Sequence, residues 1–227
     1  MGGSAAAGRA TAASDLDIAV LTADGSTHRE TLRSGGRVVE LFVHTPEGLA
    51  ELFAVDAASR RALLQHIWAE GLVLTDRDGR AAQVQERAAA ELLAGPPALG
   101  PEAVESRRYT LTDLLTDLSD TRDRFERLAV AGTVLGSAAD LLCDGRRAWT
   151  GTGKWLPRRL LAADPVLGGA LLEGHRRLCE ADDPALLAGA GGEVLHLAGG
   201  PLSEGYRRIW QGTGPPHPGP PHPPAGR

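Results

Sequence analysis

The sequence of 227 residues has few aromatic side chains, few cysteines and a single lysine. Aromatic residues make up 4% of the chain against 42% for all apolar residues, so the core must consist mostly of leucine, alanine and valine. The two cysteines, Cys143 and Cys179, lack the spacing of a structural metal site. We interpret both as reduced thiols of a cytoplasmic protein.

The sequence also lacks an excess of positive charge and long apolar runs. A formal net charge of −5 argues against a dedicated nucleic-acid groove, because such domains are usually basic. No apolar run approaches the ~20 residues of a membrane span, and the chain does not open with a charged and then apolar signal segment. These features predict a cytoplasmic protein with no membrane contact, for which nucleic acid is a less favoured partner.

The segment from Gly2 to Val20, GGSAAAGRATAASDLDIAV, carries the strongest functional pattern. Asp15 and Asp17 begin a strand-like run, and side chains two apart on a strand point to the same face. Two adjacent carboxylates repel each other unless a cation lies between them, and Mg²⁺ binds such oxygens together with substrate phosphates. Upstream, Gly3 and Ser4 offer N–H and O–H donors for a phosphate.

A third carboxylate, Glu40, interrupts the apolar run RVVELFVH at residues 37–44. Each acidic element also has an ordinary explanation. An Asp-x-Asp is most often a turn or a solvated strand end, and Glu40 can be the polar-face residue of an edge strand. The combination with the Gly-Ser turn favours a metal site.

These residues resemble the signature of the DNA polymerase β-like nucleotidyltransferase superfamily, in which a Gly-Ser turn is followed by Asp-x-Asp and then by a third acid on a neighbouring strand. The likeness is to its small bacterial, aminoglycoside-adenylyltransferase-like members. It implies an α+β fold, with a small mixed-sheet nucleotidyltransferase core and a C-terminal helical bundle. It also implies that Asp15, Asp17 and Glu40 are catalytic metal ligands and that Gly3 and Ser4 grip the β- and γ-phosphates.

The function implied by this resemblance is magnesium-dependent transfer of a nucleoside monophosphate, most simply AMP from ATP, to a hydroxyl of a small molecule or protein. Glu40 would complete a second metal site or act as general base. The alternative is a catalytically weak or inactive regulatory, antitoxin-like module that binds nucleotide or protein without turnover. In the family a helix and half a strand precede the Gly-Ser turn, whereas only Met1 and Gly2 do here, so we expect a shortened first strand.

Residues 1–79 are predicted to form the α/β core. Turn residues and apolar periodicity predict two strands, a further short strand or loop, two helices and a short buried strand. In chain order these are Asp15 to Thr22, Thr27 to Leu32, Arg37 to His44, a helix starting at Thr45-Pro46-Glu47, a helix carrying Leu63, Leu64, Ile67 and Trp68, and Leu72 to Leu74.

Residues 80–211 are predicted to be helical, and the Pro/Gly/His tail at 212–227 to be disordered, with no function for His217 or His222. The leucine stripe that begins at Leu111 has helical spacing. The expected helices are Arg80 to Leu93, one from Gly100-Pro101-Glu102, Ser119 to Leu142, Pro165 to Cys179, Asp183 to Ala190 and Gly192 to Trp210.

The segment from Arg146 to Arg159 differs from its helical surroundings in its glycines, tryptophans and cationic residues. A P-loop is excluded because Ala148 and Trp155 stand where that motif needs glycine and Ser or Thr. The segment is similar to a Trp-x-Gly-x-Gly-Lys-Trp-Leu-x-Arg pattern in the helical half of some bacterial nucleotidyltransferases. Lys154 is therefore predicted to bind the triphosphate or the acceptor; the alternative is a tryptophan-pinned loop with solvated arginines.

Overall fold

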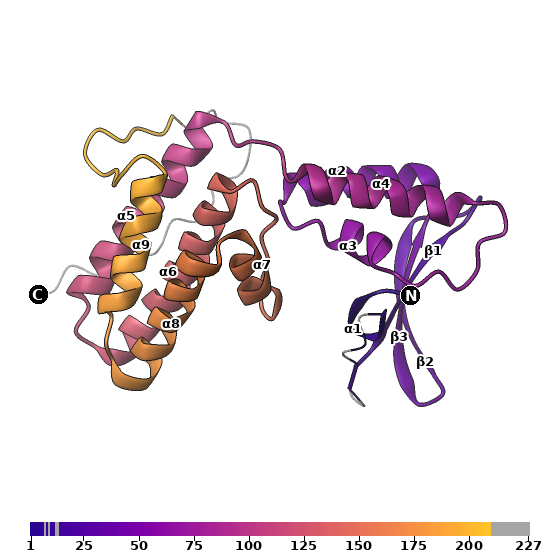
Figure 1. Cartoon of the computed structure of the whole chain (residues 1–227), viewed down its shortest axis with the longest axis horizontal. Coiled ribbons are helices and arrows are strands. Elements are labelled where there is room, and N and C mark those ends of the chain that lie inside the picture. Colours follow the sequence, from indigo (N-terminus) through magenta and orange to yellow (C-terminus); the bar gives the residue numbers. More distant parts are fainter. Residues whose placement is uncertain (7, 9, 12–13, 210–227) are drawn as a thin grey trace, which may run out of the picture.

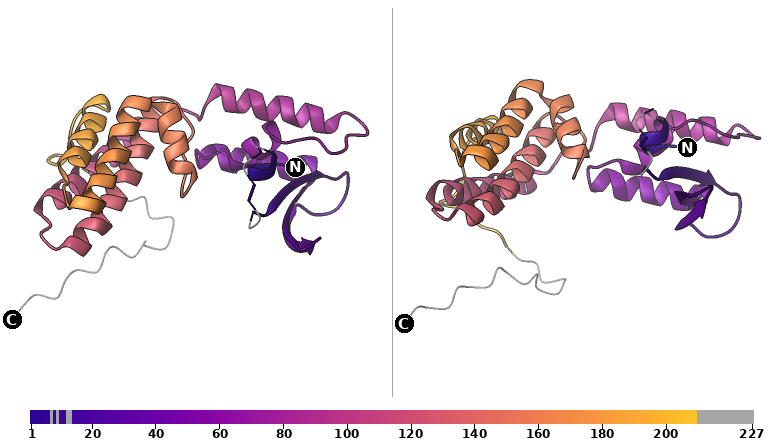
Figure 2. Two further views of the ribbon diagram at one scale, coloured as in Figure 1. Left: turned by 60° about the horizontal axis from the view of Figure 1, so that its bottom comes forward. Right: turned by 90° about the horizontal axis from the view of Figure 1, so that it is seen from below.

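The computed structural model describes residues 1–209 apart from residues 7, 9, 12 and 13. It is α+β: a small mixed sheet with helices comes first, and a helical bundle follows beside it (Figure 1). The two further views in Figure 2 also show these units next to each other. The predicted fold class is confirmed.

The sheet has the strand order β1-β3-β2, with β1 parallel and β2 antiparallel to β3. Gly35 and Gly36 both have positive φ, which allows the tight turn between the last two strands. The predicted strands at 15–22 and 37–44 are confirmed, and the segment 27–32 forms a strand. The bounds are β1 Leu16–Leu21, β2 His28–Ser34 and β3 Arg37–His44.

The helices α2 Pro46–Ala58, α3 Leu63–Ala69 and α4 Arg80–Ala94 pack with the sheet. Phe42 of β3 shares one buried cluster with Phe53, Ile67 and Ala88, one from each of these helices. Because Ala88 belongs to α4, this hydrophobic cluster includes a helix that follows residue 79, and the domain boundary placed there stays a prediction.

The start of α2 is the one that the sequence predicts. The hydroxyl oxygen of Thr45 accepts a hydrogen bond from the Gly48 N–H at 3.1 Å, and Pro46 occupies the first turn, where it displaces no helical hydrogen bond. The helix predicted around Leu63 and Ile67 is α3; the Asp56 carboxylate accepts from the Leu64 N–H at 2.7 Å from within α2.

The prediction of a buried strand at residues 72–74 is wrong. Leu72, Val73 and Leu74 are irregular, and 58%, 41% and 60% of their surfaces are exposed. Leu72 exchanges two backbone hydrogen bonds with Met1, each of 2.8 Å, and does not join the sheet. A short apolar run becomes a strand only when a neighbouring strand completes its ladder. Here a groove of about 640 Å³ separates these residues from β1 at the sheet edge.

The second unit contains α5 Pro101–Asp120, α6 Arg124–Gly145, α7 Trp155–Ala163, α8 Pro165–Ala181 and α9 Ala185–Leu197. They share one leucine-, alanine- and valine-rich core, as the composition predicts. The predicted continuation from Ser119 to Leu142 is interrupted at 121–123, because Asp123 caps α6 by accepting from the Phe125 and Glu126 N–H groups.

The end of the helical unit also differs from the prediction. Gly191 does not break α9, since it packs closely against Leu115, so the two expected helices are one. The helix ends at Leu197 and not at Trp210, because Gly199 and Gly200 take positive φ and their carbonyls accept from Arg108. The predicted tail at 212–227, with His217 and His222, lies outside the described residues.

Helix α6 bears on the expectation that no segment spans a membrane. By length and composition alone α6 could cross a membrane, and among the described residues it is the one helix of which this is true. Seven of its residues are buried, and most of them lie in the helical core, as expected for a central helix of a bundle. The cytoplasmic location remains a prediction.

Candidate functional site

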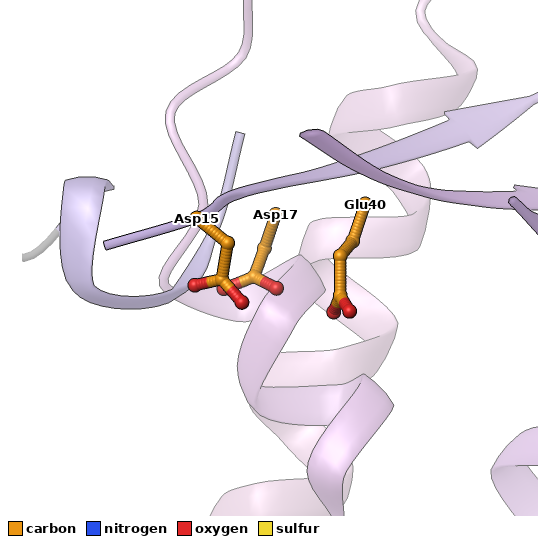
Figure 3. A group of neighbouring side chains, drawn as sticks. All are labelled: Asp15, Asp17 and Glu40. Carbon is orange, nitrogen blue, oxygen red and sulfur yellow. The ribbon is translucent and has the colours of Figure 1, made fainter. Parts of the chain in front are cut away.

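Three carboxylates meet at one end of the two parallel strands. Asp17 of β1 lies opposite Glu40 of β3 in the sheet register, and Asp15 directly precedes β1. Period-2 alternation therefore puts all three side chains on one face, and Figure 3 shows them pointing the same way. One carboxylate oxygen from each lies within 4.8 Å of the others, so the cluster has the spacing of a metal-ligand set.

The cluster is electrostatically unbalanced. Burial raises the pKa of Asp17 above its usual value, and the neighbouring charges of Asp15 and Glu40 raise it further. Lys154 and Arg29 oppose this shift. A divalent cation would relieve the repulsion and satisfy hard oxygen ligands, so the residues present fit Mg²⁺ or a similar ion.

Glu40 differs from the two aspartates because it has a cation of its own. Arg29 on β2 forms a 2.6 Å ion pair with its carboxylate. The same guanidinium lies 5.0 Å from the ring centroid of Phe42, which holds it along the strand surface. The third acid is therefore engaged within the sheet, whereas none of the ion pairs found among the described residues involves Asp15 or Asp17.

Gly3 lies against Asp17 in the short helix α1 Gly3–Ala6. Its φ of +64° is a backbone conformation that L side chains rarely adopt, and a Cβ at this position would collide with the Asp17 carboxylate. The neighbouring Gly2 N–H donates to the Asp17 carbonyl at 2.8 Å. Glycine is thus required here by close approach to the acid; its role toward phosphate stays a prediction, and the side chain of Ser4 lies outside the described part of the chain.

The acids line a cavity of about 540 Å³ between the two units. The opposite wall comes from the helical unit and includes Lys154, so the two segments that the sequence analysis selects independently face one space. The remaining lining includes cationic, polar, acidic and apolar groups. Among them are Arg29, Arg61, Arg158, Arg159, His66, Glu70, Thr150, Thr152, Gly3, Phe42 and Trp155.

The cationic wall begins where a loop becomes α7. Lys154 occupies the N-cap position, and Pro157 is accommodated in the first turn of the helix. Two guanidinium groups, those of Arg158 and Arg159, lie 4.9 and 5.2 Å from the ring centroid of Trp155. The interpretation of residues 146–159 as a loop is therefore wrong from Trp155 onward. Arg158 and Arg159 were not proposed as site residues; their signal was the excess of cations in this segment.

His66 and Glu70 on the α3 side of the cavity were also missed. The His66 Nδ1 atom lies 2.6 Å from a Glu70 carboxylate oxygen. Burial lowers the pKa of His66, and the charge of Arg159 lowers it further, while Glu70 opposes both. A single histidine in an apolar helix has no sequence signature, so only the folded arrangement places it at the cavity.

No family model matches this chain, and no curated protein sequence matches it. Among solved structures it is similar to a nucleotidyltransferase-like protein from Exiguobacterium sibiricum 255-15, at 13% sequence identity and a TM-score of 0.40. The match covers 80% of this chain and 61% of that one, so the chain spans less than two thirds of that protein. Similarity at this level establishes neither a family nor an activity.

Proposed function

We propose that this chain is a magnesium-dependent nucleotidyltransferase that moves a nucleoside monophosphate, most simply AMP from ATP, to a hydroxyl acceptor. The observation that carries the proposal is the pairing of opposite walls around one cavity. On one side of the cavity lies a cluster of three carboxylates, whose negative charge the nearby cations do not balance. On the other side lie lysine and arginine side chains. A metal–triphosphate complex has the complementary pattern, a cation at one end and anionic oxygens beyond it.

Asp15 and Asp17 would hold the metal, and Glu40 would complete a second metal position. A bound Mg²⁺ neutralises charge on the phosphates and on the departing pyrophosphate. Arg29 pairs with one carboxylate oxygen of Glu40, so the other oxygen is the one that a metal or an acceptor proton would use. We favour the metal-ligand role, because the three acids have the spacing of a ligand set.

Lys154, Arg158 and Arg159 would bind the triphosphate from the other wall. A guanidinium presents a planar set of donors that matches phosphate oxygens, and the ammonium acts as a compact point charge. Stacking on Trp155 restricts the motion of both arginines, so less conformational freedom is lost when they bind.

In the transfer itself, the acceptor oxygen forms a bond to the α-phosphorus while the bond from that phosphorus to the bridging oxygen breaks. Pyrophosphate leaves with the bonding electrons, and the acceptor proton is lost to a carboxylate of the cluster or to water. The chain contributes mainly by holding the reactants in line and by offsetting their charge. The acceptor, a small molecule or a protein, stays open.

The proposal is tested with ATP labelled at its α-phosphate, Mg²⁺ and mixtures of small hydroxylated compounds and of proteins as acceptors. Wild-type protein should release pyrophosphate and place an equal amount of label on the acceptor. Asp17→Asn should do neither while keeping its circular dichroism, and the matched variant Asp24→Asn, at an exposed acid beyond the end of β1, should behave as wild type. Turnover retained by Asp17→Asn would refute the metal assignment.

A binding module without turnover is the second candidate. The Arg29–Glu40 ion pair favours it, because it engages the carboxylate that a general-base mechanism would use. Such a module would bind magnesium and ATP in equilibrium dialysis but release no pyrophosphate with any acceptor. Pyrophosphate release by the variant Arg29→Gln alone would show that the ion pair blocks an otherwise complete site.

A further inference from the structure

In the described part of the chain the two units meet mainly through their connecting segments. Helices α2 and α3 pack on the sheet and on each other, α4 packs on α3, and α5 to α9 pack among themselves. At the junction the Arg60 guanidinium, from the α2–α3 connection, pairs with the Asp144 carboxylate from the last turn of α6. Each of these side chains is only 5% exposed, so the ion pair is buried.

Arg60 is fixed by more than this one ion pair. It also donates to the carbonyl of Pro97, in the segment that links the two units. Its backbone has φ of 63°, a left-handed conformation that costs energy for a residue other than glycine and persists only when surrounding contacts hold it. Arg107 of α5 forms a second, 2.8 Å ion pair with Asp144, so this carboxylate lies between guanidinium groups from both units.

The backbone of the junction leads directly to the cavity. The Thr150 N–H donates to the Arg60 carbonyl at 2.8 Å, and the Trp149 indole N–H donates to the Leu92 carbonyl of α4 at 3.0 Å. Residues 150–152 then line the cavity, and Lys154 follows at the start of α7. The position of the cationic wall relative to the acids is therefore set at this junction.

We propose that Arg60 is a positioning residue that holds the cationic wall opposite the carboxylate cluster. Arg60 does not line the cavity, but two residues attached to it do. Arg61 follows it in sequence, and the Thr150 N–H donates a hydrogen bond to its carbonyl. The inference rests on the proposed function, since it concerns how one metal–triphosphate complex meets both walls. In this inference, the buried Arg60–Asp144 ion pair keeps the carboxylate cluster and the cationic wall at the separation that one ligand needs.

The test compares two ligands that need different parts of the cavity. Mn²⁺ alone, followed by electron paramagnetic resonance, needs only the carboxylates, whereas ATP with Mg²⁺, followed by calorimetry, needs both walls. In Arg60→Gln the affinity for Mn²⁺ should stay within about twofold of wild type, while the affinity for MgATP should fall by about tenfold or more because the walls are no longer held in register. Asp144 keeps its partner Arg107, so the variant retains a paired carboxylate.

Arg127→Gln is the matched control. Arg127 also pairs with an aspartate, Asp182, at 2.7 Å, but inside the helical unit, and it does not line the cavity. Both affinities should be unchanged in this variant even though its thermal stability falls. Arg60→Lys, which keeps the charge but not the planar fork that reaches both Asp144 and Pro97, should restore part of the MgATP affinity.

Equal MgATP affinity in Arg60→Gln and wild type would overturn the inference and leave the proposed function intact. Parallel loss of Mn²⁺ and MgATP binding in a folded Arg60→Gln would also overturn it, because the residue would then act on the α/β unit as a whole. Wild-type protein that binds Mn²⁺ but no MgATP would instead overturn the proposed function, and with it the task given to Arg60.

Discussion

The two walls of the cavity are built in different ways. The acidic wall is formed by neighbouring strands, where the register of β1 on β3 places Asp17 beside Glu40. The cationic wall is formed by a loop and the first turn of α7. Its position depends on the buried ion pair between Arg60 and Asp144, two residues that are distant from each other in sequence. Backbone hydrogen bonds thus fix the first wall locally, whereas a few contacts between units fix the second.

This difference predicts which changes affect which ligand. Changes within the acidic wall should alter metal binding and everything that depends on it. Changes in the cationic wall should alter nucleotide binding and leave the metal in place.

The largest effect is expected from Gly3→Ala. A Cβ at this position collides with the Asp17 carboxylate and is strained at φ of +64°, so the carboxylate must shift from its place in the cluster. The affinity for Mn²⁺ should fall by about 100-fold, which corresponds to ~2.7 kcal/mol. Electron paramagnetic resonance of Mn²⁺ titrations measures it.

Gly8→Ala is the control for that experiment, because Gly8 has nearly the same φ, +65°, with nothing within 4 Å of an added Cβ. It should lose about 1 kcal/mol of stability through backbone strain and keep its metal affinity. If Gly3→Ala and Gly8→Ala bound Mn²⁺ equally well, close packing on Asp17 would have no part in forming the acidic wall.

A smaller effect of a different kind is expected from Lys154→Ala. Removing the ammonium should weaken MgATP binding by about tenfold, the magnitude of one charge-assisted contact at ~1.4 kcal/mol. Because the charge of Lys154 lowers the pKa of Asp17, it also competes with a metal, so Mn²⁺ should bind the variant slightly more tightly. Calorimetry and Mn²⁺ titration measure the two affinities.

Arg176→Ala serves as the control, since it removes an exposed cation on α8 that pairs with Glu173 and does not line the cavity. It should change neither affinity. A decrease in Mn²⁺ affinity in Lys154→Ala that matched the decrease for MgATP would mean that the walls do not act separately.

The smallest effect is the pH dependence of the metal-free protein. Burial and the neighbouring carboxylates raise the pKa of Asp17 in the folded state, so the folded protein holds this proton more tightly than the unfolded chain does. The resulting destabilisation is absent below the unfolded pKa of about 3.9 and grows as the pH rises through the folded value. In EDTA, Asp17→Asn should therefore melt higher than wild type at neutral pH, with the difference vanishing toward pH 4.

Thermal melts of both proteins across this pH range check the sign. Excess Mg²⁺ should reverse the order at neutral pH, because only wild type gains stability from the bound ion. An Asp17→Asn variant that melted lower than wild type in EDTA at pH 7 would show that Asp17 is stabilised by groups other than a metal.

The acidic wall could be predicted from the sequence because its determinants are local. Asp15 and Asp17 share a face through the strand period, and Glu40 lies in the most strongly β-forming run of the chain. To place Glu40 beside the aspartates, one also had to assume that its strand neighbours the first one. In the structure β1 and β3 do pair. The start of α2 at Thr45 was predictable for the same reason, since its capping groups are adjacent in sequence.

The cationic wall was predictable only in part. The unusual composition around Lys154 marked the segment, but nothing in it indicated that α7 begins at Trp155 or that Arg158 and Arg159 line the same cavity as the acids. Arg60 gave no signal at all, because its partner Asp144 is distant in sequence and is brought close only by folding. The buried strand predicted at Leu72 to Leu74 did not form for a related reason: within the described ranges of the chain, these residues have no neighbouring strand to pair with.

The central claim is that one cavity binds a metal and a nucleoside triphosphate through opposite walls. The most direct measurement is a calorimetric titration of ATP into wild-type protein with Mg²⁺ and again in EDTA, repeated with Asp17→Asn. The account predicts binding at one site per chain that requires Mg²⁺ and is lost in the variant. Equal binding in EDTA, or no binding of ATP, GTP, CTP or UTP by folded wild-type protein in Mg²⁺, would contradict it.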